Sequence, residues 1–192
     1  MTDTDMVAKF IAENCRYVPK LKYMHGKSPG TRYTGQFYLA ELMYDPGMLD
    51  MVCKNFHEQI EKIYPDMKFQ IAGREWSAIP LITILPYYFM QKKIEINSFM
   101  VRRKRKNYGK NNVIEGRANG YPVVAVDDLC NSTDSFMDVR MVCRAEDIPV
   151  SDYIYAVLNK YGKDDQTGRD RADPEAKTLY MVDRDDIRRF TI

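Results

Sequence analysis

The sequence predicts an α/β protein whose central, mostly parallel sheet is flanked by helices. Short apolar runs typical of strands alternate with longer segments in which apolar residues recur every three or four positions. The clearest strand is 123–126, VVAV, which is apolar without interruption, as expected for a strand buried on both faces. A chain of 192 residues suffices for one such domain with a sizeable core, so we expect a single domain over 1–192.

Two adjacent acids follow this strand. Asp127 and Asp128 come directly after it, and small polar residues dominate 131–135. In open α/β sheets, ligands bind outside the carboxyl ends of strands, and a helix that begins near Ser135 would direct free N–H groups toward an anion. The pattern predicts a sugar phosphate site, with carboxylates for ribose hydroxyls and with hydroxyls and amides for phosphate. An ordinary strand followed by a solvated acidic turn is the alternative.

The segment VVAVDDLCNSTDS resembles the phosphoribosyl pyrophosphate (PRPP) signature of type I phosphoribosyltransferases, a hydrophobic strand followed by two acids, two apolar residues and a Thr/Ser/Gly loop. The resemblance implies that Asp127 and Asp128 are catalytic and help to bind Mg²⁺. It implies a PRPP-binding loop made of Asn131, Ser132, Thr133, Asp134 and Ser135. The family generally has glycine at Thr133 and threonine or alanine at Asn131, and Asp134 adds a negative charge.

A second anion site is predicted after a strand at 68–72. Gly73 opens a turn there and Pro80 begins a helix, so this loop also lies at the carboxyl edge of the sheet. In the family this place holds the pyrophosphate loop, commonly a glycine, variable residues, then a small residue before Ile-Pro. The loop residues here would be Arg74, Glu75, Trp76 and Ser77. A simple strand-to-helix turn is the alternative.

Basic residues follow a strand expected over 94–102. The segment FMVRRKRKNYG resembles the Phe-x-Arg-Lys-x-x-Lys-x-His-Gly-like segment that opens a mobile loop in orotate phosphoribosyltransferases. The resemblance implies that Arg102 and Arg103 bind PRPP. It also implies that Lys106 is a catalytic lysine that reaches across a dimer interface, so we expect a homodimer; Tyr108 replaces the histidine. Without this context, such a run is usually a solvated face, a polyanion patch or a nuclear-localisation signal.

The residues up to about 43 are predicted to form a small hood on the core, 44–192. A helix is expected over 5–17, and the apolar segment ending near Met43 resembles the strand that lines the base pocket in orotate phosphoribosyltransferases.

That resemblance implies base contacts by Phe37 and Tyr38, with buried core aromatics as the alternative. The chain also lacks two lysines of the orotate enzymes, because Met24 and Ser77 stand in their places.

The remaining helices and strands follow the same patterns. Asp45 and Pro46 form an N-cap and first-turn pair for an amphipathic helix that Pro65 stops. The helix after Pro80 contains Pro86, which should kink or end it. A helix over 135–144, strands over 153–158 and 179–182, and a last short helix capped by Asp183 complete the expected elements.

The leading hypothesis is a Mg²⁺-dependent enzyme that transfers a phosphoribosyl group from PRPP to a nitrogenous base and releases pyrophosphate, similar to orotate phosphoribosyltransferase. The alternative is a non-catalytic regulatory protein that binds PRPP or a nucleotide on the same fold. An RNA-binding module is disfavoured because no pattern of stacking aromatics accompanies the basic run.

The composition excludes several other classes. A net charge of +2 predicts no strong attraction to nucleic acid, and no apolar run approaches the length that spans a bilayer. The N-terminus has acids where a signal peptide would carry positive charge, and the four cysteines lack metal-ligand spacing. We therefore expect a cytoplasmic protein without membrane or nucleic-acid partners.

Overall fold

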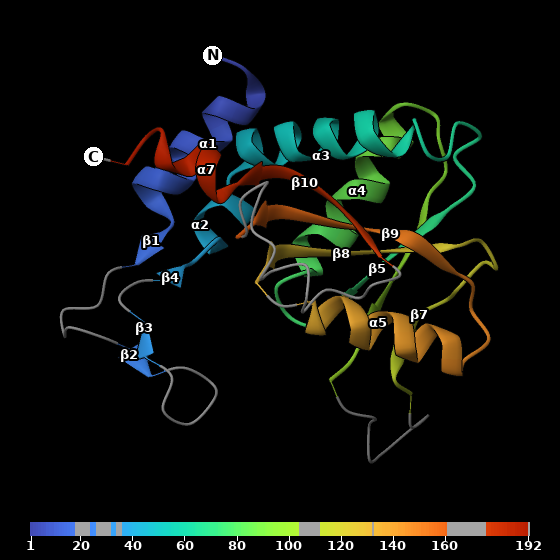
Figure 1. Cartoon of the computed structure of the whole chain (residues 1–192). Helices are drawn as coiled ribbons and strands as arrows, with labels where there is room; N and C mark the ends of the chain where they lie inside the picture. The colour runs from blue at the N-terminus through green and yellow to red at the C-terminus, as the bar shows by residue number, and fades with distance from the viewer. Residues whose placement is uncertain are drawn as a thin grey trace.

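The structure is a computed structural model that describes residues 1–17, 24–25, 32–33, 36–103, 112–131, 133–160 and 176–191. Its centre is a six-stranded sheet in the order β10–β9–β8–β5–β6–β7 (Figure 1). The strands are β5 (Gln70–Arg74), β6 (Asn97–Val101), β7 (Ile114–Gly116), β8 (Val123–Cys130), β9 (Val150–Asn159) and β10 (Lys177–Asp183). Every neighbouring pair is parallel except β6 with β7. The predicted mostly parallel α/β sheet is confirmed.

Helices cover both faces of this sheet. The helices are α1 (Asp3–Asn14), α2 (Ala40–Met43), α3 (Pro46–Ile60), α4 (Ile79–Gln91), α5 (Asp134–Ala145) and α7 (Arg184–Arg188). Figure 1 shows α3 and α4 above the sheet and α5 below it, with α1 and α7 side by side near the end of β10. An ion pair of 3.1 Å between Arg189 Nη2 and Asp5 Oδ1 joins the segment after α7 to α1.

The apolar run of β8 explains why the sheet has a core on each face. Val124 and Val126 belong to the cluster beneath α3 and α4, whereas Val123 and Ala125 belong to the cluster beneath α5. Successive side chains of a strand point to opposite faces, so an uninterrupted apolar run suits a central parallel strand. The predicted burial on both faces is confirmed.

The predicted helix start at Asp45 is also confirmed. Its side chain accepts a hydrogen bond of 2.9 Å from the Met48 backbone N–H, and Pro46 occupies the first turn. The helix ends at Ile60, before Pro65. Asp183 caps α7 as expected, since its Oδ1 accepts hydrogen bonds from the backbone N–H groups of the next turn.

One prediction about local structure was wrong. The segment ending near Met43 was expected to be a strand, but its last residues form the short helix α2, which follows β4 (Gln36–Phe37). Leu39, Leu42 and Met43 are all buried, and their spacing of three and four residues is that of a helix. Of the two effects predicted for Pro86, a kink or an end of its helix, the end does not occur, because α4 continues to Gln91.

Several helices and strands also begin or end at other residues than predicted. The N-terminal helix expected over 5–17 is α1, which begins and ends earlier, and β6 is shorter than the predicted strand over 94–102. In the hood, β1 (Arg16–Tyr17) pairs with β4, and β2 (Met24–His25) pairs with β3 (Arg32–Tyr33), both antiparallel.

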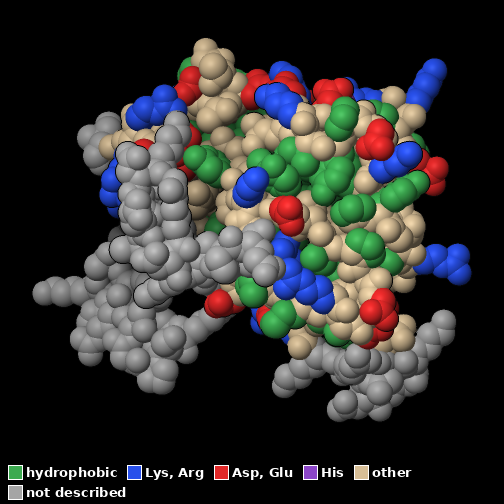
Figure 2. Space-filling model, turned by 45° about the vertical axis from the view of Figure 1, so that its right-hand side comes forward, with side chains coloured by type: hydrophobic (Ala, Val, Ile, Leu, Met, Phe, Trp, Pro, Cys, Tyr) green, Lys and Arg blue, Asp and Glu red, His purple; other side chains and the backbone are tan. Residues whose placement is uncertain are grey.

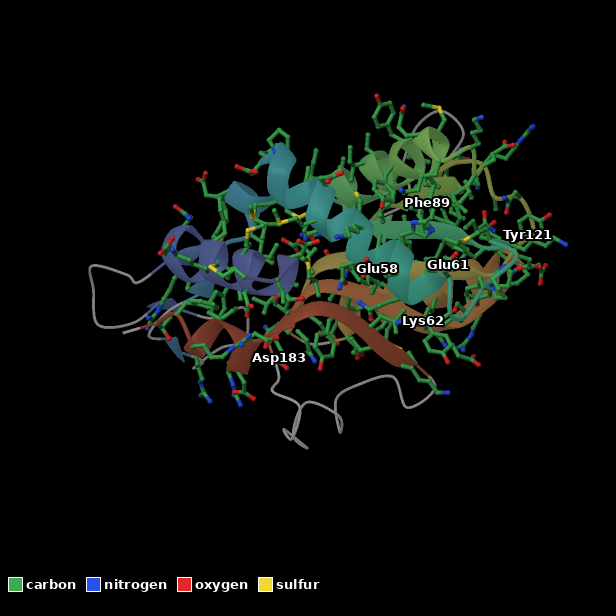
Figure 3. The ribbon with its side chains drawn as sticks, turned by 90° about the horizontal axis from the view of Figure 1, so that it is seen from above. Glu58, Glu61, Lys62, Phe89, Tyr121 and Asp183 are labelled. Atoms are coloured by element: carbon green, nitrogen blue, oxygen red, sulfur yellow. The ribbon has the colours of Figure 1, made fainter. Side chains whose placement is uncertain are left out.

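A buried polar network lies at the amino end of the strands. Gln70 is fully buried, and its Nε2 donates a hydrogen bond of 2.6 Å to the Tyr121 carbonyl. Its Oε1 accepts from Asn97 Nδ2 at 2.8 Å and from the Asn119 N–H at 3.0 Å. Figure 3 shows Tyr121 at the opposite end of the sheet from Asp183, the last residue of β10. We call Gln70, Asn97, Asn119 and Tyr121 the amino-end network.

The surface shows no dominant charge on the face drawn in Figure 2, where acidic and basic side chains are interspersed among hydrophobic ones. Within the described residues, no helix combines the length and the apolar character needed to cross a bilayer.

Candidate functional site

Three of the predicted site segments meet at the carboxyl edge of the sheet. The acids lie near the end of β8, the loop 74–78 follows β5, and Arg102 follows β6. These strands are immediate neighbours in the order β8–β5–β6 and run parallel. Their carboxyl ends therefore share one edge of the sheet, as expected for a ligand site in an α/β protein.

Asp127 is the buried member of the acid pair. It is 4% exposed and lies within β8, which continues to Cys130, so the acids belong to the strand instead of following it. Its Oδ1 accepts hydrogen bonds from Ser77 Oγ at 2.6 Å and from the Asp128 backbone N–H at 2.9 Å. The carboxylate is therefore held in one orientation by two donors.

Asp128 is partly exposed beside it. Burial, the neighbouring Asp127 charge and a hydrogen bond to the Asp127 carboxyl together raise the pKa of Asp128 to about 7. Two adjacent carboxyl groups in a poorly solvated place favour sharing a proton over ionising fully. A cation bound between them would remove that repulsion and displace the proton.

The loop 74–78 folds back tightly onto the sheet. A Cβ on Gly73 would lie 2.3 Å from Ala78 Cβ and 3.1 Å from the Val126 carbonyl, so only glycine permits this approach. On the other side, the Glu75 N–H donates to the Val101 carbonyl at 3.1 Å, and Glu75 Oε1 accepts from the Arg103 N–H at 2.9 Å. The loop is thereby fixed to both β8 and the end of β6.

The middle of this loop is open to solvent. Trp76 is 75% exposed, and the peptide bond that joins it to Glu75 is cis.

Two arginines of the site are paired with acids. Arg74 forms an ion pair with Asp138 on α5, and Arg102 Nη1 lies 3.4 Å from Glu115 Oε1 on β7. Asp138 and Glu115 were not among the predicted site residues. No local sequence signal identifies them, because each contact joins residues on different elements.

The predicted phosphate loop leads into α5. The helix begins at Asp134, one residue earlier than expected, and the Thr133 carbonyl accepts the Met137 N–H at 2.8 Å. Thr133 is buried, Ser135 is partly buried, and Asn131 and Asp134 are exposed. Asp134 lies in the first helical turn, where its charge is favourable toward the helix dipole.

Two predicted residues lie outside the described ranges. They are Lys106, in the predicted mobile loop, and Ser132, in the phosphate loop. Phe37 packs against the hydrophobic core, whereas Tyr38 is 62% exposed and its N–H donates to the Cys15 carbonyl at 2.7 Å. Of the two predicted base contacts, Tyr38 presents the larger accessible surface.

The acid pair suits magnesium better than a metal that needs a full set of protein ligands. Among the described residues, no group of three or more His, Cys, Asp or Glu side chains is arranged to hold a metal ion. Mg²⁺ in phosphate-transfer sites usually takes one or two carboxylates together with substrate phosphates and water. Asp127 and Asp128 therefore fit a magnesium ion that arrives with a phosphorylated substrate.

Comparisons with known proteins identify relatives. No protein-family model matches the sequence. The chain is 24% identical over 145 residues to the orotate phosphoribosyltransferase of Aquifex aeolicus, covering 75% of each protein.

Solved structures share the fold. Orotate phosphoribosyltransferase from Aeropyrum pernix superposes with a TM-score of 0.71 at 15% identity over 95% of this chain and 96% of that one. Adenine phosphoribosyltransferase from Saccharomyces cerevisiae gives a TM-score of 0.63 at 16% identity, over 92% of this chain and 99% of that one. The chain therefore has the fold of the type I phosphoribosyltransferases, and the proteins similar to it in sequence include orotate phosphoribosyltransferases.

Proposed function

We propose that the protein transfers a phosphoribosyl group from Mg²⁺-bound PRPP to a nitrogenous base and releases pyrophosphate. The observation that carries this proposal is the meeting of the acid pair, the loop 74–78 and Arg102 on neighbouring strands at one sheet edge. PRPP has a ribose between two phosphate groups, so it needs carboxylates flanked by anion sites. Orotate is the first base to test, because orotate phosphoribosyltransferases are among the relatives.

The chain's own residues would act mainly by position and charge. Breaking the ribose C1–O bond passes through an oxocarbenium-like state, which a protein favours by aligning the reactants and stabilising the charges. Asp127 and Asp128 would hold the ribose hydroxyls. The loop 74–77 and the arginines 102 and 103 would meet the pyrophosphate, and 131–135 would hold the 5′-phosphate. Arg74 and Arg102 would exchange their carboxylate partners for phosphate oxygens.

Mg²⁺, when bound at Asp127 and Asp128, would neutralise the diphosphate and so improve it as a leaving group.

The predicted loop lysine would complete this site. Lys106 would act when its loop closes over the substrates and keeps water from the reacting carbon.

We also propose that the protein forms a homodimer. Helix α4 is apolar around most of its circumference, and its outer side exposes Tyr87 by 55% and Met90 by 57%. A helix that is hydrophobic on all sides is typically covered on all sides. A second copy of the chain is the partner that the family resemblance predicts.

The four cysteines are buried free thiols, which supports a reducing, cytoplasmic location.

The test is a screen of bases for pyrophosphate release from Mg²⁺-PRPP, with PRPP binding measured separately by calorimetry. The variant Lys106→Ala should lower kcat by about 100-fold with a much smaller effect on PRPP affinity, because the lysine acts in the closed state. Lys110→Ala, in the same basic segment, is the matched control. If the wild-type protein binds PRPP but turns over no base, the non-catalytic PRPP-binding alternative replaces the enzyme proposal.

A further inference from the structure

A hydrogen bond links the two halves of the candidate site. Ser77 lies in the loop 74–78, and its Oγ donates to Oδ1 of Asp127 at 2.6 Å, although the two residues are 50 positions apart in the sequence. Ser77 is itself exposed, whereas Asp127 is 4% exposed. The hydroxyl therefore reaches down from the loop onto a buried carboxylate.

We propose that Ser77 is a positioning residue that fixes the Asp127 carboxylate and couples the loop 74–78 to the acid pair. This inference rests on the proposed function, because the ligand that both parts hold is Mg²⁺-PRPP. It assigns Ser77 a role distinct from direct contact with pyrophosphate.

The backbone around Gly73 makes the hydrogen bond possible. Because Gly73 has no side chain, Ala78 can pack over the strand close to the Val126 carbonyl. Ala78 is fully buried, so this end of the loop is held against β8 one residue before Asp127. Ser77 is the adjacent loop residue and lies where a short hydroxyl side chain reaches the acid.

The hydrogen bond also determines how Asp127 presents its second oxygen. Oδ1 already accepts from Ser77 Oγ and from the Asp128 N–H. Two donors on one oxygen restrain the rotation of the carboxylate, so a ribose hydroxyl or a cation would meet it at Oδ2, in place of the proton of Asp128. Loss of the Ser77 donor leaves the Asp128 N–H as the remaining one of these two, and the side chain gains rotational freedom.

A second attachment makes the loop a bridge between β6 and β8, the two strands on either side of β5. Glu75 holds it to the end of β6 through the Val101 carbonyl and the Arg103 N–H. Ser77 holds its other end to β8. A pyrophosphate group on this loop and a ribose on the acids would therefore be bound by one continuous unit, so ordering the loop also orders Asp127.

The test compares Ser77→Ala, which removes the donor, with Ser77→Thr, which keeps the hydroxyl. Thr83→Ala, which removes an exposed hydroxyl from α4, is the matched control. Calorimetry should show Mg²⁺-PRPP binding about ten-fold weaker in Ser77→Ala, as expected for loss of a hydrogen bond to a charged group. Ser77→Thr and Thr83→Ala should stay within about two-fold of wild type, and all four proteins should unfold at closely similar temperatures.

The outcomes separate this inference from the proposed function. Equal PRPP affinity in wild type and Ser77→Ala overturns the role of Ser77 but leaves the function standing. An equal loss in Ser77→Thr and Ser77→Ala also overturns it, since the hydroxyl would then be irrelevant. If the wild-type protein itself does not bind Mg²⁺-PRPP, the proposed function fails and the inference fails with it.

Discussion

At the amino end of β5, the buried Gln70 has partners for both its amide nitrogen and its oxygen. At the carboxyl end of the neighbouring β8, Asp127 and Asp128 lie side by side, and the pKa of Asp128 is raised by burial and by its neighbour's charge. Both clusters are polar, and they lie at opposite ends of the same sheet. The amino-end network is neutral and satisfied, whereas the acid pair is electrostatically strained.

This difference separates structural polar groups from functional ones. A satisfied neutral network stabilises the fold, because each buried donor finds an acceptor. Two adjacent carboxyl groups cost stability when both ionise, so the fold gains nothing from them without a bound cation. The comparison predicts that mutations at the two ends have opposite consequences for stability and for ligand binding.

The largest effect on ligand binding is expected from replacing the two carboxylates of the acid pair. The double variant Asp127→Asn with Asp128→Asn should remain folded, and it should bind Mg²⁺-PRPP at least about 100-fold more weakly, because neutral amides are poor Mg²⁺ ligands. Calorimetry measures the binding and thermal unfolding checks the fold. Undiminished binding by the folded variant would end the assignment of these acids.

Breaking the amino-end network should lower stability and leave ligand binding unchanged. Gln70→Ala should lower the free energy of unfolding by about 2–3 kcal/mol, because it leaves buried hydrogen-bonding groups without partners and creates a cavity. Denaturant titration measures this loss, and PRPP affinity should stay unchanged at temperatures where the variant is folded. The control is Gln59→Ala, a partly buried glutamine on α3 that contacts the Tyr180 carbonyl and should cost less.

The strain at the acid pair should also appear as a pH dependence. The Asp128 pKa is about 7 in the folded protein, against 3.8 for an unperturbed aspartic acid, so the folded state retains a proton that the unfolded state loses. Stability without Mg²⁺ should therefore fall as pH rises from about 4 to 7, by on the order of 3 kcal/mol. Asp128→Asn should have a flatter profile over this range. A wild-type stability that rises instead would contradict the raised pKa.

The smallest effect is expected at the edge of the site. Asp134→Asn removes a negative charge near the predicted 5′-phosphate position, so PRPP should bind about two- to three-fold tighter. The variant loses a favourable charge at the start of α5, which should lower stability by about 0.5 kcal/mol. Calorimetry and denaturant titration measure the two changes, and a weaker affinity would show that Asp134 does not face the phosphate.

Local sequence patterns predicted the strand, the helix start and the turn on which the site is built. The buried run before Asp127, the capping pair at Asp45 and the turn at Gly73 each have a signal within a few residues. These features depend on side-chain periodicity and backbone geometry, which a single sequence displays.

Contacts between distant residues could not be predicted in the same way. The partners of Gln70 and the Ser77 contact to Asp127 each depend on how separate strands are aligned in the sheet. The helix ending at Met43 was missed because its short apolar segment fits a strand as well as a buried helix, and packing against the core decides between them.

The exposure of Trp76 has a practical consequence for optical measurements. It is the only tryptophan among the 192 residues, and it lies in the loop 74–78 between Glu75 and Ser77, where it is 75% exposed. Its fluorescence should therefore respond to an anion bound at this loop, and pyrophosphate alone should change its intensity or emission maximum. Because the indole is already in water, the same signal will change little when the core melts, so unfolding should be followed by circular dichroism.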